Sequence, residues 1–104
     1  METLRFDRYV IENLMPDLVG HDKQPSAFIV YVYLWLRLSS SHTRRIQVSH
    51  QTIANDTGLS KSAVQGAVRN LLRRKLIDSK LESRTAVPEY AVLKPWRDRG
   101  RSHA

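Results

Sequence analysis

The chain contains no cysteine, which excludes both a disulfide framework and a thiolate metal site. This absence fits a reducing compartment, and we expect a cytoplasmic protein. No basic segment followed by an apolar run stands at the N-terminus, so no signal peptide is predicted. The longest apolar run, Ala27 to Leu36, is far shorter than the roughly 20 residues that cross a bilayer. We therefore expect a soluble protein without a membrane partner.

Residue sets for catalysis or metal binding are equally scarce. The histidines show no metal-ligand spacing; they are His21, His42, His50 and His103. The sequence contains no recognisable Ser–His–acid arrangement, and its four glycines form no phosphate-binding loop. We expect a protein that is not an enzyme and that needs no cofactor and no metal.

Acidic residues are few beside the basic ones. The 104 residues include 17 Lys and Arg against 10 Asp and Glu, a formal net charge of +7. Eight of the basic residues lie between positions 37 and 75, where Asp56 is the only acidic residue. An excess gathered in one stretch is unlike an evenly solvated surface, and such basic domains commonly bind nucleic acid.

The first long element is predicted from an apolar stretch. Ala27 to Leu38 exceeds the usual length of a strand, so we expect a helix there, with Ser26 as its N-cap. Before it, residues 1–25 form an N-terminal extension in which Tyr9 to Ile11 are predicted to form a short strand. A helix that is apolar on every face must be covered on every face, either by residues 1–20 or by a second subunit. We expect a homodimer with this helix and the extension in the interface.

The middle of the chain predicts two short helices joined by a tight turn. Ile46 to Val48 alternate as an edge strand, and Ser49 is the N-cap candidate of the helix that follows. Gly58 ends that helix, because a tight turn needs a residue that tolerates positive φ. Ser60 then caps a helix that runs to about Lys75, with apolar residues at helical spacing. These apolar positions are Val64, Ala67, Val68, Leu71 and Leu72.

A β-hairpin is predicted after this helix. Residues 77–82 alternate as a half-exposed strand, 83–88 form a loop, and 90–93 form the returning strand. Residues 94–104 are polar and basic, and we expect a flexible tail that contacts DNA without sequence preference.

At this point the sequence resembles a known family. The segment HQTIANDTGLSKSAVQGAVR, residues 50–69, resembles the helix-turn-helix of bacterial winged-helix regulators, GntR-like and MarR-like modules among them. The likeness covers about Ile46 to Leu93, and Thr57 and Ala67 are less apolar than the pattern usually has. It implies a mainly α fold with a small β-hairpin wing, a winged helix-turn-helix with a three-helical core. The expected domain is 26–93.

The resemblance implies that the last helix enters the major groove of DNA. Its outward side chains would then contact the edges of the bases: Gln65 can form two hydrogen bonds with adenine, and Arg69 can form two with guanine. The hydroxyl groups of Thr52, Ser60 and Ser62 and the ammonium of Lys61 are better suited to hydrogen bonds with phosphates. The full predicted DNA-binding set is Thr52, Ser60, Lys61, Ser62, Gln65, Arg69, Arg73 and Arg84. Gly66 either permits a close approach of DNA or reflects drift at an exposed position.

Three functions stay open on these residues. The first is sequence-specific binding of double-stranded DNA by a transcriptional regulator. The second is a DNA-binding module for replication initiation or plasmid maintenance, which shares the fold. The third is a winged-helix protein–protein adaptor that does not bind DNA. Whatever the function, Lys61 and Arg69 can also be ordinary solubilising residues on an exposed face, and Arg73 and Arg74 can serve only to stabilise a helix end.

Overall fold

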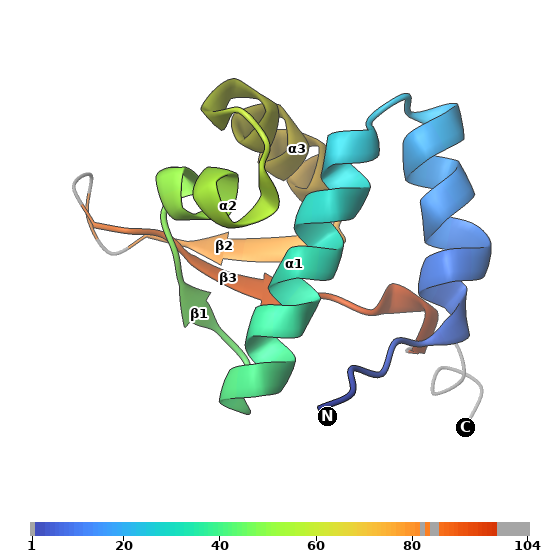
Figure 1. The fold of residues 1–104 in the computed structure, drawn as a ribbon, viewed down its shortest axis with the longest axis horizontal. Helices are drawn as coiled ribbons and strands as arrows, with labels where there is room; N and C mark the ends of the chain where they lie inside the picture. The colour runs from blue at the N-terminus through green and yellow to red at the C-terminus, as the bar shows by residue number, and fades with distance from the viewer. Residues whose placement is uncertain (1, 82, 84–85, 98–104) are drawn as a thin grey trace.

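The computed structural model describes residues 2–81, 83 and 86–97. Its helical segments are η1 (Val10–Leu14), η2 (Asp17–His21), α1 (Pro25–Ser41), α2 (His50–Thr57) and α3 (Lys61–Arg73). Its strands are β1 (Ile46–Gln47), β2 (Ile77–Lys80) and β3 (Glu89–Val92), in an antiparallel sheet of order β1-β3-β2. Figure 1 shows the helices gathered around one long central helix, α1, with the small sheet beside it. The predicted mainly helical chain with a small β-hairpin is confirmed at this level.

Helix α1 is the long helix that the apolar stretch predicts. It starts two residues earlier than expected: Pro25 occupies the first turn, where its missing N–H costs nothing, and Gln24 is the N-cap. The predicted N-cap role of Ser26 is therefore wrong, since Ser26 lies inside the helix. The helix ends at Ser41, and the next residue, His42, is its C-cap with a left-handed φ of 56°. None of the described helices, α1 included, combines the length and apolar character that a membrane span requires.

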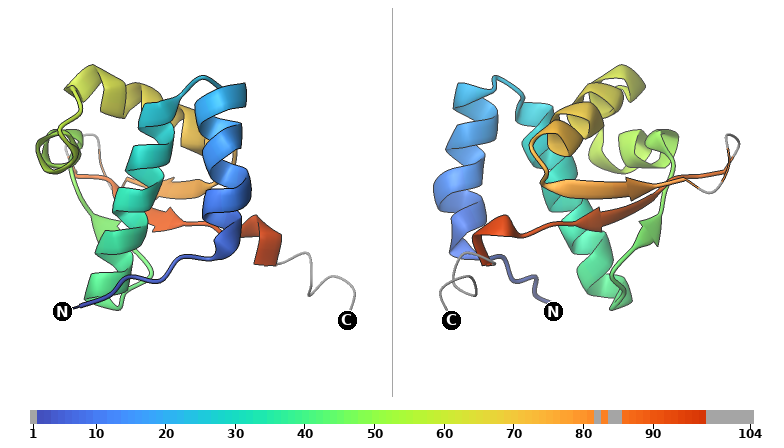
Figure 2. Two further views of the ribbon diagram at one scale, coloured as in Figure 1. Left: turned by 45° about the vertical axis from the view of Figure 1, so that its right-hand side comes forward. Right: turned by 180° about the vertical axis from the view of Figure 1, so that it is seen from behind.

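The N-terminal segment, which we define as residues 7–22, is helical from residue 8 to residue 21 and contains η1 and η2. The predicted strand at Tyr9 to Ile11 is therefore wrong. Val10, Leu14 and Leu18 recur every four residues and are all buried in the same core as α1. Burial of this face outweighs the strand propensity of the local sequence. The segment stands beside α1 over most of its length (Figures 1 and 2).

This segment answers the question of what covers α1. The extended stretch before it adds Phe6, whose ring lies 5.4 Å from that of Trp35, and the Trp35 indole N–H donates to the Arg5 carbonyl at 2.8 Å. Residues within 1–20 thus cover the side of α1 that would otherwise be open. Ile29 and Leu36 of α1 stay 41% and 42% exposed, so the covering is partial and the homodimer stays a prediction.

The turn between α2 and α3 is built as the sequence predicts. Ser49 accepts a hydrogen bond from the Thr52 N–H at 3.1 Å, and Ser60 accepts one from the Ala63 N–H at 3.1 Å. Gly58 has a φ of 82° and its N–H donates to the Ala54 carbonyl. Both N-caps and the glycine stop are confirmed.

Helix α3 buries a slightly different face from the one predicted. Val64, Ala67, Val68 and Leu71 are buried as expected, but Leu72 is 38% exposed and Asn70 is 3% exposed. The side of α3 at position 70 faces the N-terminal segment, which the sequence pattern did not include. The helix ends at Arg73, two residues early, because Lys75 adopts a left-handed φ of 56°.

The hairpin follows the predicted order. β2 pairs with β3, and β1 pairs with β3 from the other side, with Ile46 opposite Tyr90. The edge-strand prediction for β1 is confirmed. β2 is shorter than expected, since it ends at Lys80 and Leu81 is 51% exposed.

The beginning of the predicted flexible tail is packed onto the N-terminal segment. The Trp96 ring stacks on Tyr9 with centroids 4.6 Å apart, and its indole N–H donates to Asp7 at 2.7 Å. A tail that is free from Lys94 onward is therefore wrong for residues 94–97, because the Trp96 ring finds an aromatic partner. Residues 98–104 lie outside the described part of the chain.

Candidate nucleic-acid interface

One face of α3 collects three polar side chains in a row. Lys61, Gln65 and Arg69 are spaced four residues apart, which places them one above the other along the helix. All three are exposed, and so is Ser62 at the first turn. Gly66 lies between them, and a Cβ built there would meet only the Arg69 guanidinium, at 4.0 Å. The face is open and made of groups that can donate hydrogen bonds.

Two other elements meet this face. Lys61 and Gln65 line an open hollow of about 330 Å³ together with the start of α2 and the residues that precede β3. These other lining residues are Ser49, His50, Gln51, Ala86, Val87 and Pro88. The fold thereby gathers α2, α3 and the end of the hairpin loop around one surface, although residues 49 and 88 are far apart in sequence.

Five of the nine described arginines pair with a carboxylate, whereas Lys61 and Arg69 have no counterion, a feature that Lys61 shares with the other four described lysines. Within the described residues, no ion pair involves Lys61 or Arg69. Six carboxylates elsewhere each lie within ion-pair distance of an arginine. The pairs are Asp7–Arg97, Glu12–Arg8, Asp17–Arg74, Asp22–Arg74, Asp56–Arg37 and Asp78–Arg45. Because α3 itself contains no acidic residue, its outer face keeps its full positive charge.

Arg73 and Arg74 behave differently from Lys61 and Arg69. The Arg73 guanidinium donates to the Asn70 side chain, whose amide donates to Asp22 at 3.3 Å. Arg74 bonds to Asp17 and lies 3.5 Å from Asp22. Both arginines are thus engaged at the junction with the N-terminal segment. Arg73 therefore differs from Lys61 and Arg69 of the predicted DNA-binding set, because its guanidinium is already hydrogen-bonded within the protein.

The predicted hydroxyl groups stand at the starts of α2 and α3. Ser60 and Ser62 lie at the N-terminus of α3 with their oxygens 3.3 Å apart, and Thr52 accepts a hydrogen bond from Ser49 at 3.0 Å at the N-terminus of α2. All three predicted residues are exposed. Helix N-termini carry partial positive charge and suit anions. Arg84 lies outside the described residues.

His50 was not predicted for this surface, although it belongs to the hollow. Its Nε2 lies 3.0 Å from the hydroxyl oxygen of Tyr90, a buried residue of β3. Burial, with a smaller effect of the Lys61 charge, lowers the pKa of His50. The sequence could have predicted this position, because His50 directly follows the Ser49 N-cap and so lies in the first turn of α2.

A second polar cluster lies away from this face. Asp17, His21 and Asp22 bring potential ligand atoms within 4.8 Å of one another. Asp17 and His21 lie four residues apart on η2, with Asp22 as its C-cap, so the spacing is present in the sequence, where only pairs of histidines were considered. His21, which hydrogen-bonds to Asp22 at 2.9 Å, is the main cause of the lowered pKa of that carboxyl. Arg74 already supplies positive charge to both carboxylates, so the cluster serves to hold the N-terminal segment.

In comparisons with protein-family models, with curated protein sequences and with solved structures, nothing matches the chain.

Proposed function

We propose that this chain is a winged helix-turn-helix domain that binds double-stranded DNA, with α3 as the helix that enters the major groove. The observation that carries the proposal is the exposed row of Lys61, Gln65 and Arg69, whose two cations have no counterion in the described residues. An exposed row of cations without a counterion favours an anionic partner.

The geometry of α3 suits the major groove, which is wide enough to admit one helix. Gln65 can accept from and donate to adenine, and Arg69 can donate two hydrogen bonds to guanine. Lys61, near the N-terminus of α3, suits a phosphate on the rim of the groove. In this arrangement the hairpin of β2 and β3 forms the wing beside the same duplex, and the N-terminus of α2 approaches the backbone.

The biological role that we propose is transcriptional regulation by sequence-specific binding. A module for replication initiation would bind duplex DNA through the same surface, and a binding sequence selected from random duplexes would separate the two by its genomic position. The proposal requires no second subunit, and sedimentation velocity at tens of micromolar tests the homodimer that the sequence predicted.

The test of DNA binding is fluorescence anisotropy with a labelled duplex at several salt concentrations. We expect binding whose logarithmic salt slope falls by about one unit for each phosphate contact removed. The double variant Lys61→Gln, Arg69→Gln should bind far more weakly. Arg8→Gln is the matched control, because it removes one exposed arginine from the N-terminal segment, where Arg8 pairs with Glu12. Equal losses in both variants, or salt-independent binding, would contradict the proposal and favour a protein–protein adaptor.

A further inference from the structure

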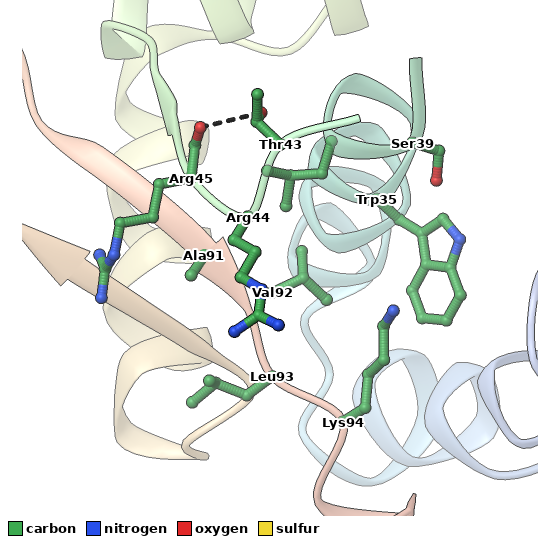
Figure 3. A pocket seen from close by; sticks show the side chains of 10 residues that line it. Trp35, Ser39, Thr43, Arg44, Arg45, Ala91, Val92, Leu93 and Lys94 are labelled. Atoms are coloured by element: carbon green, nitrogen blue, oxygen red, sulfur yellow. Dashed lines mark hydrogen bonds between the residues drawn. The ribbon is translucent and has the colours of Figure 1, made fainter. Parts of the chain in front are cut away.

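A histidine lines the hollow of about 330 Å³ beside α3, which we call the α2–α3 hollow. His50 belongs to its lining from the first turn of α2, as does Lys61 from α3, and none of the described lining residues is a carboxylate. A larger hollow, of about 550 Å³ at the other end of β3, has Arg44 and Lys94 in its lining but no histidine (Figure 3). Of these two surfaces, the one beside α3 is therefore the one whose charge a histidine can change.

The His50 ring is fixed from the core side by a tyrosine. Its Nε2 lies 3.0 Å from the hydroxyl oxygen of Tyr90, which is 1% exposed. Burial raises the pKa of Tyr90, so its hydroxyl stays neutral around neutral pH. A neutral imidazole accepts from that O–H at Nε2, and an imidazolium donates its Nε2–H to the same oxygen. The ring can therefore gain a proton without losing its contact with β3.

The second ring nitrogen of His50 is left for a ligand. Nδ1 forms no hydrogen bond within the described part of the chain. When Nε2 accepts from Tyr90, the proton of the neutral ring lies on Nδ1, and a charged ring carries a proton there as well. Nδ1 can thus donate to an acceptor such as a phosphate oxygen, and this hydrogen bond is stronger when the ring is charged.

The charged groups around His50 disfavour its protonation in the free protein. Burial, with the smaller effect of Lys61 on α3, lowers the pKa of His50. Glu89 of β3 does not line the hollow, because successive side chains of a strand point to opposite faces. Asp56, the acidic residue of α2, lies in the last turn of that helix, and β1 holds no titratable residue. No carboxylate of these elements stabilises the charged ring, so an anion would have to come from outside the domain.

A DNA phosphate in the α2–α3 hollow would supply that anion. Between Lys61 and His50 it would bring negative charge to the ring, and an opposite charge within about 4 to 6 Å favours the charged form. A group that takes up a proton on binding makes the binding tighter as the pH falls. The ring charge that is unfavourable in the free protein is then favourable in the complex.

We propose that His50 is a phosphate-contacting residue whose protonation is coupled to duplex binding, which makes the binding tighter as the pH falls from about 7.5 to about 5.5. His50 acts here within the proposed DNA-binding function, on which the inference rests, and adds to it a residue outside the row on α3. Its geometric support is that Lys61 and His50 share one lining without a carboxylate and that Tyr90 fixes the ring. Because the contact is to the DNA backbone, the pH effect should not depend on base sequence.

The test is fluorescence anisotropy of a labelled random-sequence duplex with the full chain, between about pH 5.5 and about pH 7.5 at constant ionic strength. The affinity of the parent should rise about threefold to tenfold as the pH falls, because a rise of about 1 in the pKa of one group on binding limits the change to about tenfold. His50→Gln, which keeps a polar side chain but cannot titrate, should show little of this rise. His42→Asn is the matched control, because it removes an exposed histidine outside the hollow and asparagine tolerates the left-handed φ there. It should respond to pH as the parent does.

An NMR titration of the histidine ring protons of the parent gives a second readout that needs no variant. The pKa of His50 should be higher in the duplex-bound protein than in the free protein, while that of His42 should not change. A pH response that persists in a folded His50→Gln protein, or a His50 pKa that the duplex does not raise, would overturn the proposal and leave the DNA-binding function in place. Absence of duplex binding at every pH would overturn both.

Discussion

Asp7 and Arg97, 90 residues apart in sequence, form a two-pronged ion pair: the Arg97 Nε donates to one carboxylate oxygen at 2.7 Å and Nη2 donates to the other at 2.6 Å. The same Asp7 carboxylate accepts the Trp96 indole N–H. Together with the stacking of Trp96 on Tyr9, this pair fastens the two ends of the described chain to each other.

The first prediction concerns the stability that this pair supplies. The Arg97 side chain holds the pKa of Asp7 at about 2, below its ordinary value of 3.8. A carboxyl with a lowered pKa stabilises the fold when it is ionised, so its contribution is complete above about pH 5 and is lost as the pH falls from about 4 to about 2. Asp7→Asn should lower the free energy of unfolding at neutral pH by about 1 to 2 kcal/mol and flatten the acid limb of a pH–stability curve.

Glu12→Gln is the matched control for Asp7→Asn. It removes a carboxylate that also pairs with an arginine, Arg8, but the two side chains are 54% and 88% exposed. Exposed pairs contribute little, so urea denaturation should show a loss below about 0.5 kcal/mol. Equal losses in the two variants would mean that the Asp7–Arg97 pair has no special role.

The second prediction separates groups that read bases from groups that hold phosphates. Arg69→Ala should cost about 1 to 3 kcal/mol on the preferred duplex and relax the choice of base at one position. Lys61→Ala should weaken binding to preferred and random duplexes alike. Both residues are exposed, so circular dichroism should show an unchanged fold. Unaltered base preference in Arg69→Ala, measured by selection from random duplexes, would argue against groove reading by this residue.

Val64→Asp is the folding control for that comparison. Val64 is fully buried in the core, and a carboxylate placed there has no partner in the neighbouring apolar side chains. We expect this variant to unfold and to lose binding to every duplex together with its helical circular dichroism signal. A folded Val64→Asp protein would show that the core is not packed as described.

The third prediction uses Gly66, which lies inside α3. Alanine is favoured over glycine within a helix by about 1 kcal/mol, and the added Cβ would meet nothing closer than Arg69 at 4.0 Å. Gly66→Ala should therefore raise the melting temperature. If the position is kept small for close approach to DNA, the same variant should bind duplex more weakly despite its greater stability. Greater stability with unchanged affinity would assign Gly66 to drift at an exposed site.

The fourth prediction concerns the protonation of His50. Burial is the main reason that its pKa lies below 6.5, and the Lys61 charge adds to the effect. A histidine with a lowered pKa favours the fold in its neutral form, so stability should fall as the pH drops below 6.5 towards the pKa of the folded state. An NMR titration of Lys61→Gln should show the His50 pKa moving up towards 6.5. A His50 pKa that does not respond to this substitution would mean that Lys61 does not act on the ring.

The sequence by itself determined the features that depend on neighbours within one or two turns. Ser49, Gly58 and Ser60 were predicted correctly, because a cap or a stop is completed by bonds to residues three or four positions away. The row of Lys61, Gln65 and Arg69 was predicted for the same reason, since helical spacing alone brings these residues onto one face.

Only the tertiary structure decided which surfaces of these elements meet. Asn70 is buried and Leu72 exposed because the N-terminal segment packs on one side of α3, bringing Asp22 to Asn70 across 48 residues. The engagement of Arg74 with Asp17, and of Asp7 with Arg97, likewise joins residues 57 and 90 positions apart. Propensity and periodicity describe a chain over a few turns, whereas these contacts depend on free energy gained when distant segments bury surface together.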